Sequence, residues 1–348
     1  MRAAQHQPDS APVLEVKDLR VTFAGGRSAA PARAVDEVNL ALREGEIIAL
    51  IGESGCGKST LARALVGLVK PQAGQVIRKG SPLRYSKAAL RQHRRSVQLV
   101  LQDPAGALNP RHTVYDLVAE GPRLHGLTDD LYQRVCSALN QAGLRPPEQF
   151  LARYPHQLSG GQQQRVVIAG ALALAPAVLV ADEPVSSLDA SARGEVLRLL
   201  LELRDSLGLS ALVVSHDLGL AWNIADRVAV MYLGRIVELG TVEEVLLRPR
   251  HPYTKALLSI LPGSRSAESL TLLQGEAPDP TAIPAGCRFH PRCPLYSQRH
   301  GDARAPWCRE RDPGVLPALS ELPLAACHFV TPAPADDAVP PLASSVSQ

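Results

Sequence analysis

One segment of eight residues, Gly52 to Ser59, constrains the fold of this chain more than any other. It reads GESGCGKS and matches the pattern G-x-x-x-x-G-K-[ST] at every fixed position. The apolar run IIALI at 47–51 precedes it, and the helix-like segment GKSTLARALVGL follows. A strand, a glycine-rich turn and a helix in this order place backbone N–H groups and a helix N-terminus around a phosphate. The segment therefore predicts a nucleotide phosphate site in an α/β fold.

Two side chains of this loop supply its chemistry. Lys58 can reach the β- and γ-phosphates, and the Ser59 hydroxyl can ligate Mg²⁺. A chance glycine-rich turn is the alternative, but the flanking strand and helix argue against it. We expect further nucleotide contacts from the rest of the loop and the helix start, namely Gly52, Glu53, Ser54, Gly55, Cys56, Gly57 and Thr60.

A second apolar run ends in two acids. VLVA at 178–181 is followed by Asp182 and Glu183. An acid at the carboxyl end of a strand faces the ligand crevice of an open α/β sheet. We expect Asp182 to hold Mg²⁺, directly or through water, and Glu183 to orient or polarise the attacking water. Many strands end in acids before a turn, so the pair alone is weak evidence for a site. It becomes strong evidence because it follows a phosphate-binding loop in the chain.

The remaining apolar pattern predicts alternating strands and helices. Residues 13–23 and 35–42 alternate apolar and polar side chains, as half-buried strands do. Further apolar runs, each close to a helix-like segment, occupy 97–101, 178–181 and 211–214. Strands that alternate with helices favour an α/β core with a parallel sheet.

Two regions depart from this pattern. Between about 104 and 165 apolar residues recur at helical spacing, which predicts a small helical subdomain inserted into the core. Over 251–330 prolines multiply and four cysteines appear, which predicts a separate, irregular C-terminal module. The composition of the ends at 1–12 and 331–348 predicts disordered tails. The α/β domain itself then occupies 13–250.

Composition excludes several functional classes. The chain has 348 residues and a formal net charge of +3, which is small for this length and gives no basis for nucleic-acid binding. No stretch approaches the roughly 20 apolar residues that cross a bilayer, and the first residues lack the apolar core of a secretory signal. We therefore expect a cytosolic protein whose link to a membrane depends on a partner chain.

The segment LSGGQQQR at 158–165 resembles the signature of ABC ATPases and stands just before the acidic strand, as it does in that family. A capped helix start with Ser159 as the cap is compatible with this interpretation. The resemblance implies an α/β P-loop NTPase fold of the ABC type. In the family, this segment closes over the γ-phosphate held by another subunit, which implies a head-to-tail pair of ATPase subunits. The positions carried over for this contact are Ser159, Gly160, Gly161 and Gln162.

Other family positions follow in order along the chain. Gln102, in LQDP, matches the glutamine that senses Mg²⁺ and couples to the membrane partner. Asp189, in SLD, matches the loop that crosses the subunit interface, and His216 matches the histidine that contacts the γ-phosphate. Lys58, Glu183 and His216 form the catalytic set that the resemblance implies. Phe23 is a candidate for stacking on adenine, with a core phenylalanine as the alternative.

Three motifs restrict the resemblance to one group of ABC ATPases. QDPAGALNPRHTV at 102–114, HPYT at 251–254 and GCRFHPRCP at 286–294 together resemble the ATPase subunits of dipeptide, oligopeptide and nickel importers. Ala107 stands where that family usually has serine. The resemblance implies ATP and Mg²⁺ as ligands, a second ATPase subunit, two integral membrane permease subunits and a solute-binding protein. It places the chain at the cytoplasmic face of the plasma membrane.

Other functions remain open at this point. The ATPase could power the import of nickel or another small solute instead of peptides. A soluble ABC ATPase acting on nucleic acid or ribosomes usually carries two ATPase units or long insertions, whereas this chain has one unit and a short helical insertion. An exporter ATPase would normally lack HPYT and the cysteine-bearing tail. Membrane partners favour transport, whereas ribosomes or DNA favour the soluble class.

Four cysteines gather in the last fifth of the chain with the spacing C-x₅-C-x₁₄-C-x₁₈-C. Four thiols in a cytosolic protein suit zinc or an iron–sulfur cluster, yet this spacing fits neither the usual zinc knuckle nor the compact ferredoxin run. The family resemblance favours a [4Fe–4S] cluster, and zinc or unliganded thiols are the alternatives. The segment LYSQRHGDARAPW makes the spacing between the second and third of these cysteines longer than in the family. The candidate ligands are Cys287, Cys293, Cys308 and Cys327.

Overall fold

The computed structural model describes residues 11–25, 30–259, 279–299, 301–318 and 324–330. The tails predicted at 1–12 and 331–348 lie outside these residues, apart from positions 11 and 12. No helix in the described part of the chain is long and apolar enough to span a membrane.

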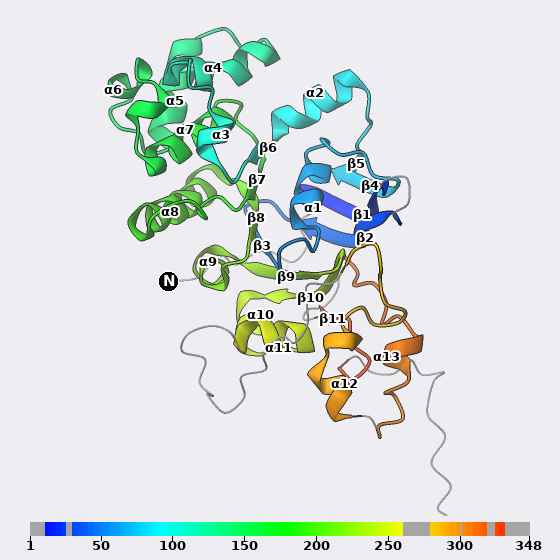
Figure 1. Cartoon of the computed structure of the whole chain (residues 1–348). Coiled ribbons are helices and arrows are strands. Elements are labelled where there is room, and N and C mark those ends of the chain that lie inside the picture. Colours follow the sequence, from blue (N-terminus) through cyan, green and yellow to red (C-terminus); the bar gives the residue numbers. More distant parts are fainter. Residues whose placement is uncertain (1–10, 26–29, 260–278, 300, 319–323, 331–348) are drawn as a thin grey trace, which may run out of the picture.

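A mainly parallel sheet forms the centre of the fold (Figure 1). β6, β7, β8, β3 and β9 run parallel in that spatial order, and β10 and β11 add antiparallel strands at one edge. Every residue of β3 is buried, as expected for an apolar run covered on both faces. The described strands of this sheet are β3 (Ile47–Ile51), β6 (Val97–Val100), β7 (Val178–Asp182), β8 (Ser210–Ser215), β9 (Arg227–Tyr232), β10 (Arg235–Thr241) and β11 (Leu324–Ala325). The predicted α/β core is therefore confirmed.

A smaller antiparallel sheet covers the helix that follows the phosphate-binding loop. Its spatial order is β2-β1-β4-β5, formed by β1 (Leu14–Phe23), β2 (Ala32–Leu42), β4 (Ala73–Arg78) and β5 (Ser81–Pro82). The helix α1 (Lys58–Leu65) contacts strands of both sheets. Its buried Leu61 belongs to one apolar cluster with Val16 of the small sheet and Ile48 of the large one. Both sheets thus hold the start of α1 in place.

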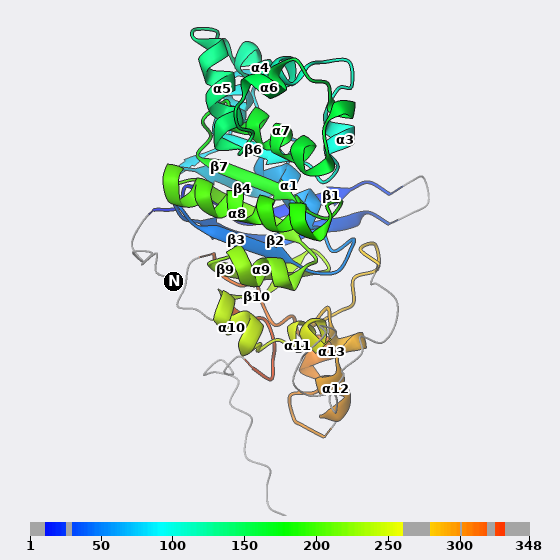
Figure 2. The same ribbon diagram turned by 90° about the vertical axis from the view of Figure 1, so that its left-hand side faces the viewer.

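A group of helices lies beyond the β6 edge of the sheet (Figures 1 and 2). Apolar residues that recur at helical spacing, such as Val114, Val118, Val135 and Leu139, are fully buried there. The helices in this part of the chain are α3 (Pro104–Ala107), α4 (Val114–His125), α5 (Leu131–Gln141), α6 (Glu148–Leu151) and α7 (Gly160–Leu172). The others in the ATPase region are α2 (Lys87–Ser96), α8 (Ala190–Leu207), α9 (Leu218–Ile224) and α10 (Val242–Leu247), and α11 (Pro252–Ser259) begins the C-terminal region.

The cysteine-bearing region lies at the opposite end of the molecule from α4, α5 and α6 (Figure 2). It contains α12 (Pro294–Gln298) and α13 (Trp307–Glu310), and its strand β11 pairs with β10 of the main sheet. Phe289 and Cys287 are buried in one apolar cluster with Val230 and Tyr232 of β9. The region expected to be a separate module therefore shares the sheet and an apolar cluster with the ATPase. Short irregular segments cannot bury enough apolar surface alone, which explains this packing.

Candidate active site

The loop between β3 and α1 passes so close to other backbone segments that two of its glycines accept no side chain. Gly57 has φ of 110°, and a Cβ there would lie 1.9 Å from the carbonyl oxygen of Ala34. A Cβ on Gly52 would lie 2.2 Å from the carbonyl oxygen of Met231. Only glycine relieves both the steric and the conformational constraint at position 57. The loop is thus held between β2 and β9.

Lys58 folds back into this loop. The side chain is buried, and its Nζ donates to the carbonyl oxygens of Gly52 at 2.7 Å and Glu53 at 2.8 Å. Cys56 lies behind it, with Sγ 3.8 Å from Nζ, and burial raises the pKa of this thiol. The ammonium group therefore lies inside the curve of the loop, where the sequence predicts phosphates. Of the remaining loop residues, Ser54 and Gly55 are exposed, and Thr60 is half-buried in the first turn of α1.

The two predicted Mg²⁺ ligands Ser59 and Asp182 meet. The hydroxyl of Ser59 donates to Oδ1 of Asp182 at 3.1 Å. Burial raises the pKa of the Asp182 carboxyl and the nearby Glu183 charge adds to this, whereas the hydrogen bond from Ser59 lowers it. Burial disfavours the charged form of this carboxylate, and a bound cation would stabilise it. The hydroxyl and carboxylate oxygens are the ligand types that Mg²⁺ prefers, so this pair fits the ion.

Glu183 is the centre of a second cluster. Its Oε2 accepts from Nε2 of Gln102 at 3.0 Å, and its Oε1 lies 3.1 Å from Nδ1 of His216. The three side chains come from the ends of β6, β7 and β8, which are neighbours in the sheet. Glu183 has φ of 48°, an uncommon value for a residue with a side chain, and its N–H donates to the carbonyl of Val214 at 2.9 Å. Such backbone strain is concentrated at functional sites.

The segment LSGGQQQR begins helix α7 through a reciprocal cap. Oγ of Ser159 accepts from the N–H of Gln162 at 3.2 Å, and Oε1 of Gln162 accepts from the N–H of Ser159 at 3.0 Å. This arrangement is a capping box, with Gly160 as the first helical residue. The capped-helix interpretation of this segment is therefore confirmed.

Asp189 lies next to this helix start. Its carboxylate caps α8 by accepting from the N–H of Ala192 at 2.9 Å. Ser159, Gly161, Gln162 and Asp189 together line a hollow of about 340 Å³. None of residues 52–60, all of which the structure describes, lines this hollow. In one chain, the signature and the phosphate-binding loop thus face different spaces.

Phe23 is the last residue of β1 and is 47% exposed. The alternative of a buried core phenylalanine is therefore wrong. The structure brings Lys58, Ser59 and Asp182 together, and joins Gln102, Glu183 and His216 in a neighbouring cluster.

Comparison with known proteins agrees with this geometry. A family model described as ABC transporter matches residues 35–186, and a model described as oligopeptide/dipeptide transporter, C-terminal region, matches 237–299. The chain is 44% identical over 298 residues to the oligopeptide transport ATP-binding protein OppF of Salmonella typhimurium, which covers 81% of this chain and 89% of OppF. It is 40% identical over 330 residues to AppF of Bacillus subtilis, covering 91% of this chain and 97% of AppF.

The chain belongs to the ABC transporter ATPase family. Solved ABC ATPase structures share its fold. CbiO1 from Clostridium perfringens, part of an ABC transporter complex, aligns with a TM-score of 0.61 and 31% identity over 68% of this chain and 91% of CbiO1. The dimeric cassette MJ0796 bound to ADP and Pi aligns with a TM-score of 0.59 and 29% identity over 66% of this chain and 98% of that cassette. The predicted fold class is therefore confirmed.

The C-terminal region of this ABC ATPase contributes two contacts to the loop that the motifs alone did not reveal. The hydroxyl of Tyr253 accepts from the N–H of Glu53 at 2.9 Å, and Arg292 donates to both carboxylate oxygens of Glu53 at 2.8 and 3.1 Å. In the sequence, these residues stand out only as members of HPYT and GCRFHPRCP, and nothing in either motif points to the phosphate-binding loop.

All six cysteines of this ABC ATPase are free thiols, and the four C-terminal ones are buried. Burial raises the pKa of Cys287 to about 12 and that of Cys293 and Cys308 to about 11. The N–H of Cys287 donates to the carbonyl of Cys308 at 2.9 Å, which ties two of the segments together. Among the described residues, no group of three or more His, Cys, Asp or Glu side chains could hold a metal ion. The predicted zinc or iron–sulfur ligand set therefore gains no support from this geometry.

Proposed function

We propose that this chain is the ATP-hydrolysing subunit of a bacterial-type ABC importer for dipeptides or oligopeptides. One observation carries the proposal, namely that the assembled loop and acid cluster share a chain with a region matching the oligopeptide/dipeptide transporter model. OppF and AppF are both named oligopeptide transport ATP-binding proteins, and they align with most of this chain. The proposed organisation is an ATPase domain over 13–250, with its helical subdomain at about 104–165, and a C-terminal module over 251–330.

The proposed chemistry assigns one task to each side chain. Lys58 binds the β- and γ-phosphates, while Ser59, Asp182 and Gln102 hold Mg²⁺, which when bound neutralises charge on the phosphates. Glu183 orients the attacking water and accepts its proton, and His216 contacts the γ-phosphate. Phe23 is exposed at the end of β1, where it can stack on adenine. The protein therefore acts mainly by positioning groups and stabilising charge.

The proposal includes a second ATPase subunit arranged head to tail. Ser159, Gly160, Gly161 and Gln162 would close over the nucleotide bound by the partner, and Asp189 would lie at the interface. The hollow lined by signature residues excludes the loop of the same chain, and this separation supports a shared site. Two permease subunits and a solute-binding protein complete the proposed importer, with the ATPase pair at the cytoplasmic face of the membrane. No nucleic acid takes part.

A [4Fe–4S] cluster on Cys287, Cys293, Cys308 and Cys327 is a separate proposal, with zinc as the alternative. Its support is the chemistry of the donor set alone, because four soft thiol ligands suit either metal centre, while the geometry of the described residues adds none. No step of the proposed ATP hydrolysis depends on it.

Reconstitution of the whole complex tests the transport proposal. The chain should co-purify from membranes with integral permease subunits. Hydrolysis of ATP by the complex in liposomes should rise when its solute-binding protein is loaded with a peptide. Stimulation by a nickel-loaded binding protein and not by peptide would assign the same ATPase to nickel. Recovery of the chain with ribosomes or DNA, without permeases, would contradict import.

A further inference from the structure

We infer that Arg292 and Tyr253 are positioning residues for ATP binding and act on the phosphate-binding loop through Glu53. The inference rests on the proposed nucleotide site at Gly52 to Ser59 and adds the C-terminal region to it. Neither residue needs to contact the nucleotide. They set the charge and the shape of the loop that does.

Arg292 neutralises the one acidic side chain of the loop. Its guanidinium donates two hydrogen bonds to the Glu53 carboxylate, at 2.8 and 3.1 Å, in the two-pronged geometry that arginine and carboxylate favour. The Arg292 side chain is 9% exposed and that of Glu53 is 23% exposed, so water screens the pair only in part. Arg292 also approaches the hydroxyl of Tyr232 at 3.5 Å. The loop therefore meets a polyanion without a free negative charge of its own.

Tyr253 holds the backbone of the same residue. It is fully buried in α11, and its hydroxyl accepts the N–H of Glu53 at 2.9 Å. Its ring packs against Tyr232 and Phe289, with centroids 4.6 and 5.4 Å away. Because the ring is enclosed on several sides, the position of the hydroxyl is determined by the core.

The start of α11 is held by a buried acid. Glu238 of β10 has no exposed surface, and its carboxylate accepts the N–H groups of Arg250 at 2.6 Å and His251 at 3.0 Å. The ring of His251 in turn accepts the N–H of Tyr253 at 3.1 Å. The motif HPYT thus connects the main sheet to Glu53 of the loop.

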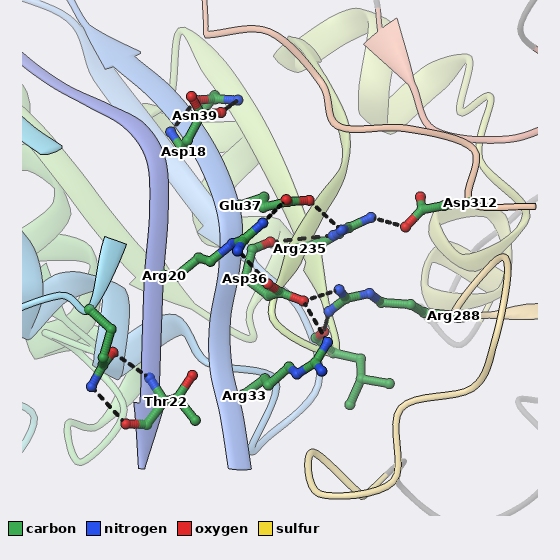
Figure 3. A network of polar contacts seen from close by, with 12 residues as sticks. Asp18, Arg20, Thr22, Arg33, Asp36, Glu37, Asn39, Arg235, Arg288 and Asp312 are labelled. Atoms are coloured by element: carbon green, nitrogen blue, oxygen red, sulfur yellow. Dashed lines mark hydrogen bonds and ion pairs between the residues drawn. The ribbon is translucent and has the colours of Figure 1, made fainter. Parts of the chain in front are cut away.

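A second arginine anchors the segment that carries Arg292. Arg288 is buried, donates to the Asp36 carboxylate of β2 and also donates to the carbonyl of Leu233 at 2.6 Å (Figure 3). Arg235 of β10 joins Glu37 and Asp312 in the same network (Figure 3). Because Arg288 is bound to the small sheet, the segment that carries Arg292 is held next to the loop.

Glu53 is consequently held at three points. Its N–H donates to Tyr253, its carbonyl accepts from Lys58, and its carboxylate pairs with Arg292. Loss of Arg292 would leave an unpaired carboxylate in the loop, where it repels phosphate. It would also remove one of the three contacts that hold Glu53. Both consequences weaken ATP binding.

A simple docking role for the ion pair makes a different prediction. If the pair served only to attach the C-terminal region, Arg292→Gln and Glu53→Gln would both lower stability and would leave the dissociation constant of MgATP unchanged. If Arg292 served to neutralise Glu53 at the phosphate site, removal of the Glu53 charge would compensate for its loss. A double-mutant cycle separates the two roles.

The experiment measures the dissociation constant of MgATP for the full-length chain, by titration at low and high salt. Arg292→Gln is expected to weaken MgATP binding about tenfold, or ~1.4 kcal/mol. In the Glu53→Gln background the same substitution should change the constant less than about twofold. The tenfold effect should shrink at high salt, because salt partly screens the repulsion between the Glu53 carboxylate and the phosphates. Arg309→Gln, an exposed arginine of the same region, is the matched control and should leave the constant unchanged.

Two further variants cover the case of a poorly folded Arg292→Gln protein. Arg292→Lys keeps the charge but not the two-pronged geometry and should weaken binding by about threefold. Tyr253→Phe should also weaken binding, because it leaves the N–H of Glu53 without its acceptor. Equal weakening by Arg292→Gln in both Glu53 backgrounds, or no weakening, would overturn the inference. A wild-type chain that binds no MgATP would instead overturn the proposed nucleotide site.

Discussion

The hydroxyl of Ser59 lies 3.1 Å from Oδ1 of Asp182, although 123 residues separate them in the chain. The contact exists because β3 and β7 flank β8 in the parallel sheet, so that both carboxyl ends open to the same edge. The loop after β3 supplies the hydroxyl and the end of β7 supplies the carboxylate. In the proposed mechanism, this pair holds Mg²⁺ beside the phosphates, and the neighbouring Glu183 cluster activates the attacking water.

Glu183→Gln should uncouple ATP binding from hydrolysis. The amide keeps the size of the side chain and its contacts with Gln102 and His216, but it is a far weaker proton acceptor. We expect the rate of phosphate release by the assembled transporter to fall about 10²- to 10⁴-fold, while MgATP binding is retained. Glu202→Gln, at an exposed position on α8, is the control. Hydrolysis at the wild-type rate by the Glu183 variant would remove this residue from the catalytic set.

Gly57→Ala should abolish MgATP binding through geometry alone. The new Cβ would lie 1.9 Å from the carbonyl oxygen of Ala34, and φ of 110° is strained for any side chain. We expect at least a hundredfold weaker binding in a titration of the full chain. Gly80→Ala is the control, because its φ of 76° is also positive but no atom lies within 4 Å of its Cβ. That variant should lose about 1–2 kcal/mol of stability and keep its affinity for MgATP. Equal loss of affinity in both variants would contradict the steric explanation.

The buried His251 should make the protein sensitive to acid. Burial lowers the pKa of His251 to about 3, from about 6.5 in an unfolded chain. Between these pH values His251 is protonated in the unfolded state but neutral in the folded state. The free energy of unfolding should therefore fall by about 1.4 kcal/mol per pH unit from pH 6 toward pH 3. The nearby Glu238 acts in the opposite direction, because burial raises its pKa and favours its protonated form in the folded state.

Urea denaturation of the wild type and a His251→Asn variant at pH 7, 6, 5 and 4 checks this prediction. The variant should be less stable at pH 7, because it loses packing, but its stability should decline less steeply toward pH 4. The comparison removes the contribution of Glu238, which both proteins share. Parallel decline of the two proteins would show that His251 does not titrate in this way.

Metal analysis tests the cysteine proposal directly. A protein purified without oxygen should contain about four iron and four sulfide per chain if the cluster is present, and should be brown. Cys327→Ser should lose that iron, whereas Cys136→Ser, which removes a buried thiol of α5, should keep it. Zinc without iron would support the alternative metal. If all six thiols of the chain react with a thiol reagent after unfolding and no metal is released, the four C-terminal cysteines are structural.

Local patterns in the sequence were sufficient to predict most of the elements of the core. The apolar run 47–51 is a fully buried strand, and the loop and helix that follow it are where the motif places them. These predictions succeed because burial of a continuous apolar run and the steric demands of Gly57 act over a few residues. The same holds for the capped start of α7, because Ser159 and Gln162 bond across a single helical turn.

Only the tertiary structure decided how the C-terminal region is attached. β11 has two residues, too few to show a strand period, and it is recognised only by its pairing with β10. Arg292 and Glu53 are 239 residues apart, and no pattern in either segment predicts that they meet. The sequence determined the phosphate-binding loop and the proposed catalytic residues at the neighbouring strand ends, because those depend on short-range sterics and on where each strand stops. The structure decided what holds the loop, because contacts between distant segments depend on strand order and on which surfaces are left to be buried.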